Sequence, residues 1–196
     1  MRPHERSRYP ARAIILHWMI ALLLIANLVI GLRMEALAGM DQFRVFQLHK
    51  SIGITVLLLT LIRIAIRLSY TAPPYPDGVA GWQRMLSKTV HGAFYGIMLG
   101  LPLTGWIVVS ASPLNIPTVL FNMIPWPDIG PLTQLSLAKK KALSGTVGDV
   151  HVLLTYLTYG LIALHVTGAL KHQFSGPVSV LYRMLPLSFL RKERPS

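Results

Sequence analysis

The feature that most restricts how this chain can fold is a run of 20 residues without a formal charge, at 13–32. About 20 apolar residues in a helix are needed to cross the roughly 30 Å hydrocarbon core of a bilayer. Three similar runs follow, at about 46–68, 86–110 and 148–170. With 53% hydrophobic residues and a mean hydropathy of +0.51, the chain is too apolar for an ordinary soluble domain. The sequence therefore predicts an all-α membrane protein, with residues 1–196 forming one bundle of four transmembrane helices.

The first run also has features of a secretory signal peptide. Arginines precede it, and Ala36-Leu37-Ala38 offers the small residues of a cleavage site. However, the run exceeds the ~7 to 15 apolar residues usual for a signal peptide, and cleavage would remove His17. We therefore expect this segment to be retained as the first helix.

The basic residues are divided unevenly between the two ends of the predicted helices. The formal net charge is +12, but these residues flank apolar runs and form no stripe or motif typical of nucleic-acid binding, so no nucleic-acid partner is expected. Cytoplasmic loops of membrane proteins are enriched in Lys and Arg, so thirteen basic residues at one end against six at the other predict that both termini are cytoplasmic. Residues 177–196 would then form a cytoplasmic tail. The thirteen are Arg2, Arg6, Arg8, Arg12, Arg63, Arg67, Arg84, Lys88, Lys171, Arg183, Arg191, Lys192 and Arg194.

Four histidines lie within or beside the apolar runs. A histidine inside a membrane is costly and indicates a functional site with a specific partner. His17 and His165 lie about 5 and 6 residues inside the inner ends of the first and fourth helices, which at ~1.5 Å per residue places both roughly 8 to 9 Å deep. The second helix runs the opposite way, so His49 lies near its outer end, on the side where His151 begins the fourth helix. The depths predict two pairs, His17 with His165 and His49 with His151.

The spacing of these histidines suits axial ligation of two haem groups. His151 and His165 are 14 residues apart, which at 100° per residue leaves them within about 40° of one face and ~21 Å apart. A porphyrin between helices takes one imidazole from each side and needs close backbone approach. We expect this approach at Gly53, Gly148 and Gly168, each about one turn from a paired histidine. The chain has no cysteine for covalent attachment, so any haem is of the b type.

Two other interpretations of the histidines stay open. Bare histidines could bind a metal ion, as in a metal-binding membrane protein or a transporter. Alternatively, each imidazole could simply bond a backbone carbonyl or a hydroxyl of a neighbouring helix. Reversible cytochrome b absorbance on reduction would distinguish haem ligation from both.

The sequence resembles the bacterial cytochrome b561 family of four-helix, di-haem membrane proteins over about residues 9–183. The segments that carry the resemblance are LHWMIALLLIANLVIGL, LHKSIGITVLLLTLIRIAIRL with YTAPPYP, VHGAFYGIMLGLPLTGW and DVHVLLTYLTYGLIALHVTGALKH. The resemblance implies a multi-pass protein of the bacterial inner membrane with two haem b groups. It also implies that His17 and His165 ligate the inner haem, and His49 and His151 the outer haem.

The resemblance implies two possible electron donors. Short, stand-alone members typified by superoxide oxidase imply electron transfer from periplasmic superoxide to ubiquinone. The cytochrome b anchors of nickel-iron hydrogenases and related dehydrogenases resemble the same fold and imply a protein donor instead. The shortness of this chain favours the first. Two haems with both axial positions taken relay electrons and do not bind oxygen.

Polar residues at both ends are candidates for contact with the donor and the acceptor. Six basic residues on the outer side could steer superoxide, although a solvated loop or lipid headgroups would also account for them: Arg33, Arg44, Lys50, Lys139, Lys140 and Lys141. On the inner side, four residues could bind a quinone or a haem propionate: His91, His172, Lys88 and Arg63. Arg63 and Arg67, four residues apart, could instead extend to the membrane interface.

The segment SPLNIPTVLFNMIPWPDIGP between the third and fourth runs contains five prolines. So many prolines exclude a fifth crossing helix, because each proline inside a helix breaks its hydrogen bonding. We expect the segment to lie over the outer haem at the membrane interface, where tryptophan is favoured. On the inner side, TAPPYPDG predicts a loop of restricted shape.

Overall fold

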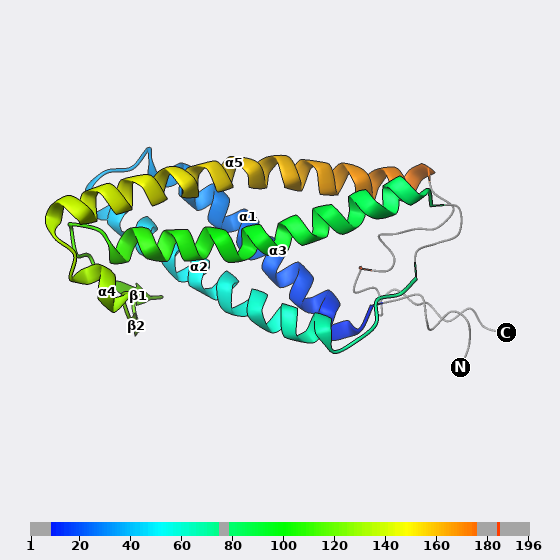
Figure 1. Ribbon diagram of the computed structural model, residues 1–196, viewed down its shortest axis with the longest axis horizontal. Coiled ribbons are helices and arrows are strands. Elements are labelled where there is room, and N and C mark those ends of the chain that lie inside the picture. Colours follow the sequence, from blue (N-terminus) through cyan, green and yellow to red (C-terminus); the bar gives the residue numbers. More distant parts are fainter. Residues whose placement is uncertain (1–8, 75–78, 176–183, 185–196) are drawn as a thin grey trace.

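The computed structural model of the protein describes residues 9–74, 79–175 and 184. Four long helices run side by side along its longest axis (Figure 1): α1 (Ala11–Met34), α2 (Gly39–Leu68), α3 (Gly81–Ser110) and α5 (Leu137–Ser175). All four are long and apolar enough to cross a membrane. The prediction of four apolar helices is therefore confirmed.

The helices extend beyond the predicted membrane spans. α2 begins at Gly39 and α5 at Leu137, several residues before the apolar runs that predicted them. The length of an apolar run indicates only the part of a helix that lies in the hydrocarbon core of the membrane. A helix can continue through polar residues, because its backbone hydrogen bonds do not depend on the side chains. The helices are therefore longer than the predicted spans, and the span bounds stay a prediction.

The core of the bundle lies between α1, α2 and α3. One buried cluster joins Ile20, Ile52, Val56 and Met98, with further apolar side chains packed around it. α5 packs most closely on α3, and little of its apolar surface is buried against the protein. The rest of that surface is available to lipid or to an apolar ligand.

A small β-hairpin and a short helix connect α3 to α5. They comprise β1 (Thr118–Leu120), β2 (Ile124–Trp126) and α4 (Gly130–Thr133), and they lie at the end of the bundle where α3 ends and α5 begins (Figure 1). The strands are antiparallel, with Leu120 opposite Ile124. The connection is not a crossing helix, as the prolines predicted, but the hairpin itself was not expected.

Hydrogen bonds from two helices hold this connection in place. The hydroxyl of Ser51 accepts a bond from the Phe121 backbone N–H at 2.9 Å. On α3, the indole of Trp106 donates to the Pro127 carbonyl at 2.9 Å. The hairpin is thereby fixed over one end of α2 and α3.

Two of the predicted inner elements fall largely outside the described residues. They are the second half of the TAPPYPDG loop, at 75–78, and the tail at 177–196 except for Met184. The Met184 carbonyl accepts a hydrogen bond from the indole of Trp18 at 2.6 Å, which brings this point of the tail against α1.

Candidate functional site

The four histidines singled out in the sequence form two facing pairs. His17 of α1 faces His165 of α5, and the ring centroids are 6.3 Å apart. The centroids of His49 on α2 and His151 on α5 are also 6.3 Å apart. Two imidazoles on opposite sides of one metal ion have about this separation, since each metal–nitrogen bond is about 2.0–2.1 Å and a ring nitrogen lies roughly 1.1 Å from its centroid. Both pairs therefore have the spacing of axial ligands.

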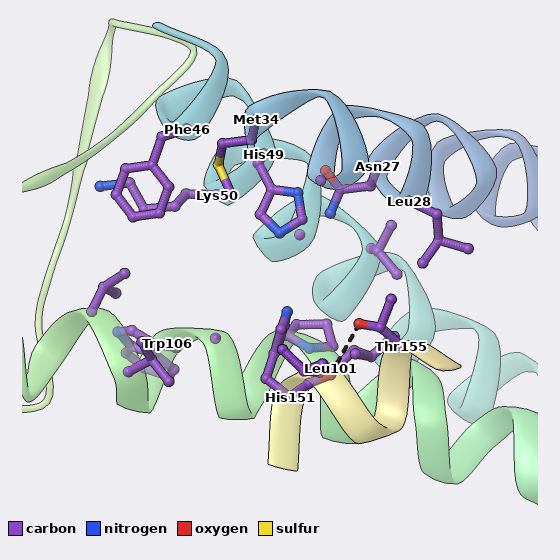
Figure 2. A pocket seen from close by; sticks show the side chains of 18 of the residues that line it. Asn27, Leu28, Met34, Phe46, His49, Lys50, Leu101, Trp106, His151 and Thr155 are labelled. Carbon is purple, nitrogen blue, oxygen red and sulfur yellow. Dashed lines mark hydrogen bonds between the residues drawn. The ribbon is translucent and has the colours of Figure 1, made fainter. Parts of the chain in front are cut away.

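The outer pair, His49 and His151, lies in a cavity of about 360 Å³. This volume is within the range of about 300–1,000 Å³ that is usual for ligand and cofactor sites. The cavity is lined by α1, α2, α3, α5 and the hairpin, mostly with apolar side chains. Figure 2 shows the two imidazoles pointing toward each other from opposite walls.

Two glycines let the outer histidines lie close to neighbouring helices. A Cβ atom on Gly31 would lie 3.4 Å from Cε1 of His49, and one on Gly105 would lie 3.3 Å from Cε1 of His151. A larger side chain at either position would push the imidazole out of place. The sequence alone does not pair these glycines with the histidines, because the contact depends on how the helices are rotated.

The three glycines predicted to adjoin a porphyrin have different surroundings. Gly53 and Gly148 line the outer cavity. A Cβ on Gly53 would lie 3.6 Å from Nδ2 of Asn27, whereas one on Gly148 or Gly168 would meet no other described atom within 4 Å. Gly148 thus leaves open space on the cavity wall, and no contact assigns a role to Gly168.

The hydroxyl of Thr104 determines which nitrogen of His151 carries the proton. Oγ1 of Thr104 lies 2.9 Å from Nδ1 of His151 and 2.7 Å from the carbonyl oxygen of Gly100. A hydroxyl has one proton, which Thr104 donates to a backbone carbonyl, so its oxygen accepts a hydrogen bond from Nδ1–H. This tautomer leaves the Nε2 lone pair free to bind a metal.

These features fit a flat, metal-containing macrocycle better than a bare metal ion. Within residues 9–74, 79–175 and 184, no group of three or more His, Cys, Asp or Glu side chains is arranged so that it could hold a metal ion. A bare zinc ion is normally held by three or four protein ligands. A haem needs only two axial imidazoles, because its porphyrin supplies the remaining nitrogens.

The inner pair has a third histidine beside it. The ring centroid of His91 lies 5.5 Å from that of His165, and the ring of Phe94 lies 5.3 Å from it. Nδ1 of His91 is 2.6 Å from the Ser87 carbonyl oxygen, so it donates there and leaves Nε2 as an acceptor. Of the four inner candidates, His91 is therefore placed next to the proposed ligands.

The other three inner candidates lie on three different helices. Arg63 on α2 donates a hydrogen bond to the Ala13 carbonyl at 2.8 Å and so ties α2 to α1. Lys88 is exposed on α3, and His172 is half-buried in the last turn of α5.

The six outer cations divide into buried and exposed groups. Lys50 and Lys140 are each only 8% exposed. Their ammonium groups donate at 3.0 Å to the Pro117 carbonyl and to Oδ1 of Asn115, respectively. These two lysines thus hold the loop before the hairpin, a contact that their position in the sequence did not reveal. The exposed group comprises Arg33, Arg44, Lys139 and Lys141, of which Arg44 pairs with Asp41 at 3.5 Å.

Four apolar helices with two facing histidine pairs define a membrane helical bundle suited to electron transfer through haem. Comparison with known families agrees with this class. The chain belongs to the prokaryotic cytochrome b561 family, whose model matches residues 8–187. It is therefore a membrane electron carrier of a family that uses haem b, as its resemblance predicted.

Three relatives align with nearly the whole chain. Cytochrome b561 homolog 2 of Escherichia coli (strain K12) is 28% identical over 182 residues, covering 91% of this chain and 92% of the relative. The probable superoxide oxidase CybB of Yersinia pestis is 27% identical over 181 residues, covering 92% and 97%. Cytochrome b561 homolog 1 of Escherichia coli (strain K12) is 27% identical over 183 residues, covering 92% and 98%.

Proposed function

We propose that the protein carries electrons across the bacterial inner membrane from periplasmic superoxide to ubiquinone. The observation that supports this most is the presence of two facing histidine pairs, separated along α5 by the 14 residues between His151 and His165. His17 and His165 would hold an inner haem b, and His49 and His151 an outer one. When bound, the two haems supply reversible one-electron transfer.

The proposed orientation places the hairpin in the periplasm and both termini in the cytoplasm. Its support is the excess of basic residues at the end of the bundle where α2 ends and α3 begins. The outer histidine pair then lies on the periplasmic side, next to the donor. The inner pair and His91 lie on the cytoplasmic side.

Exposed cations at the outer end suit an anionic donor. Arg33, Lys139 and Lys141 are all exposed there, and a positive surface raises the rate at which a small anion arrives. The name of the Yersinia relative supports superoxide as this anion. In the balanced reaction, two superoxide ions are oxidised to two O₂, and the two electrons with two protons reduce one ubiquinone to ubiquinol.

His91 is the best-placed residue for the quinone acceptor. Its Nδ1 is held by the Ser87 carbonyl, which sets the ring orientation. A quinone carbonyl is an acceptor, so His91 would have to bind it as the protonated imidazolium, through Nε2–H. Such a group could also supply a proton as the quinone is reduced.

The test is stopped-flow measurement of haem reduction after a superoxide pulse, using purified protein at low and high salt. We expect reduction that outpaces spontaneous dismutation and slows as salt rises. The double variant Lys139→Gln/Lys141→Gln should slow it by roughly tenfold at low salt, since steering contributes about 10- to 1,000-fold. The control Lys171→Gln removes an exposed charge at the other end of α5 and should have no effect.

Two results would contradict the proposal. Reduction slower than dismutation would exclude superoxide as the donor. Copurification with a hydrogenase-like or dehydrogenase partner that reduces the haems would instead identify the protein as an electron-transfer subunit.

A further inference from the structure

We propose that Thr118 and Trp126 of the hairpin, together with Lys50 of α2, form a carboxylate-binding cradle for a propionate of the outer haem. This inference rests on the proposed binding of that haem between His49 and His151. It adds a specific role for the hairpin, which positions the cofactor and does not only cover it.

The hairpin presents its two donors side by side. Thr118 of β1 is directly opposite Trp126 of β2 in the antiparallel register. Residues opposite each other in such a pair extend from the same face of the sheet, with Cβ atoms about 4.5–5.5 Å apart. Both side chains line the outer cavity. One face of the hairpin thus directs a hydroxyl and an indole toward the same space.

Both donors are buried and unused. Thr118 is only 3% exposed. Among the residues that the structure describes, neither Oγ1 of Thr118 nor Nε1 of Trp126 has a hydrogen-bond partner. Buried polar groups in proteins are almost always paired, and an indole N–H can only donate. Two neighbouring unpaired groups of this kind indicate an acceptor bound in the cavity.

The neighbouring Trp106 differs from Trp126 in that its indole N–H is already paired. The two indole rings are in edge-to-face contact, with centroids 5.7 Å apart, and both line the cavity. Nε1 of Trp106, however, already donates to the Pro127 carbonyl at 2.9 Å. Of this aromatic pair, only Trp126 has an N–H available for a ligand.

Lys50 supplies a positive charge at the same end of the cavity. One of its three N–H groups donates to the Pro117 carbonyl at 3.0 Å, which leaves two for other acceptors. Figure 2 shows the Lys50 side chain passing Phe46, on the side of the imidazoles away from Leu28. Within the described residues, Lys50 forms no ion pair.

A propionate matches this set of groups. A carboxylate only accepts hydrogen bonds, and it binds best where neutral donors and a cation converge. Most of the remaining cavity lining is apolar and suits the hydrocarbon part of a porphyrin. The cradle would therefore orient the outer haem with a propionate toward the hairpin. Asp128, which follows the hairpin, interacts electrostatically with Lys50, and it would offset part of the attraction of Lys50 for a carboxylate.

The test compares three variants of the purified, haem-loaded protein: Thr118→Val, Trp126→Phe and the control Trp82→Phe, which changes an exposed indole at the other end of α3. The first readout is the rate at which haem is lost to excess apomyoglobin. The second is the propionate bending band in the resonance Raman spectrum, which responds to hydrogen bonding at the carboxylate. We expect Trp126→Phe and Thr118→Val each to shift this band and to speed the loss of one haem by about tenfold, as for a lost hydrogen bond to a charged group. Trp82→Phe should change neither.

The opposite pattern would overturn the cradle. If both test variants keep the wild-type band and rate, or if Trp82→Phe changes them equally, the donors do not bind a propionate. A free anion in the cradle would also leave the propionate band unchanged, and so refutes the proposal. These results leave the superoxide-driven reduction intact, so failure of the cradle is distinguishable from failure of the proposed function.

Discussion

Replacing Thr104 by valine tests how the fold prepares His151 for a metal. The substitution removes the hydroxyl that accepts the 2.9 Å hydrogen bond from Nδ1 and keeps a side chain of nearly the same shape. A hydrogen bond from Nδ1–H makes the imidazole a stronger electron donor through Nε2. This favours oxidised iron, so losing the bond should raise the midpoint potential of the outer haem.

The size of the shift follows from the strength of the bond. A neutral hydrogen bond contributes about 0.5–1.5 kcal/mol net. For one electron, about 1.4 kcal/mol corresponds to roughly 59 mV. If the whole bond favours the oxidised state, the potential rises by about 20–65 mV. The Leu101 backbone, which already interacts with the His151 imidazole, can accept part of the lost bond, so this range is an upper limit.

The assay is a potentiometric titration that follows the two haems by absorbance. The matched control is Thr155→Val, since the Thr155 hydroxyl also lines the cavity but donates to the backbone carbonyl of His151 at 2.9 Å (Figure 2). Thr104→Ser keeps the hydroxyl and should restore the wild-type potential. The reasoning is refuted if Thr104→Val leaves both potentials unchanged, or shifts them no more than Thr155→Val does.

Two further predictions concern packing at the outer end. Gly105→Leu should displace His151, because a Cβ there already lies 3.3 Å from the imidazole, and the haem content should fall from two to one per chain. The control Gly92→Leu should keep both haems, because a Cβ at Gly92 meets no described atom within 4 Å. Equal haem content in the two variants would contradict this account. Lys140→Gln should lower stability by about 1.5–3 kcal/mol by weakening a buried hydrogen bond from a charged group, measured by thermal unfolding. The exposed Lys141→Gln should change it by less than about 0.5 kcal/mol, and a similar loss in both would show that burial of Lys140 is not the cause.

The features that could be predicted from the sequence are those that depend on distance along one helix. The length of an apolar run indicates a crossing helix, and counting residues from its end gives the depth of each histidine. The structure places His17 beside His165 and His49 beside His151, at the depths that this count paired. Their ligation of haem stays a prediction.

The features that could not be predicted depend on how helices and loops are rotated toward one another. Thr104 and Gly105 face His151 only because of the angle between α3 and α5, which no spacing within α3 reveals. Lys50 and Lys140 had the sequence pattern of surface cations, but the folded loop brings acceptors to both. The hairpin was not expected because its three-residue strands are too short for a clear alternation of apolar and polar residues.

The most direct test of the central claim is the haem content and reduced-minus-oxidised spectrum of the purified protein and of two ligand variants. We predict two b-type haems per chain in the wild type. His17→Ala should lose the inner haem and His151→Ala the outer one, each retaining the other. A colourless wild-type protein, or two intact bis-histidine centres in either variant, would contradict the account.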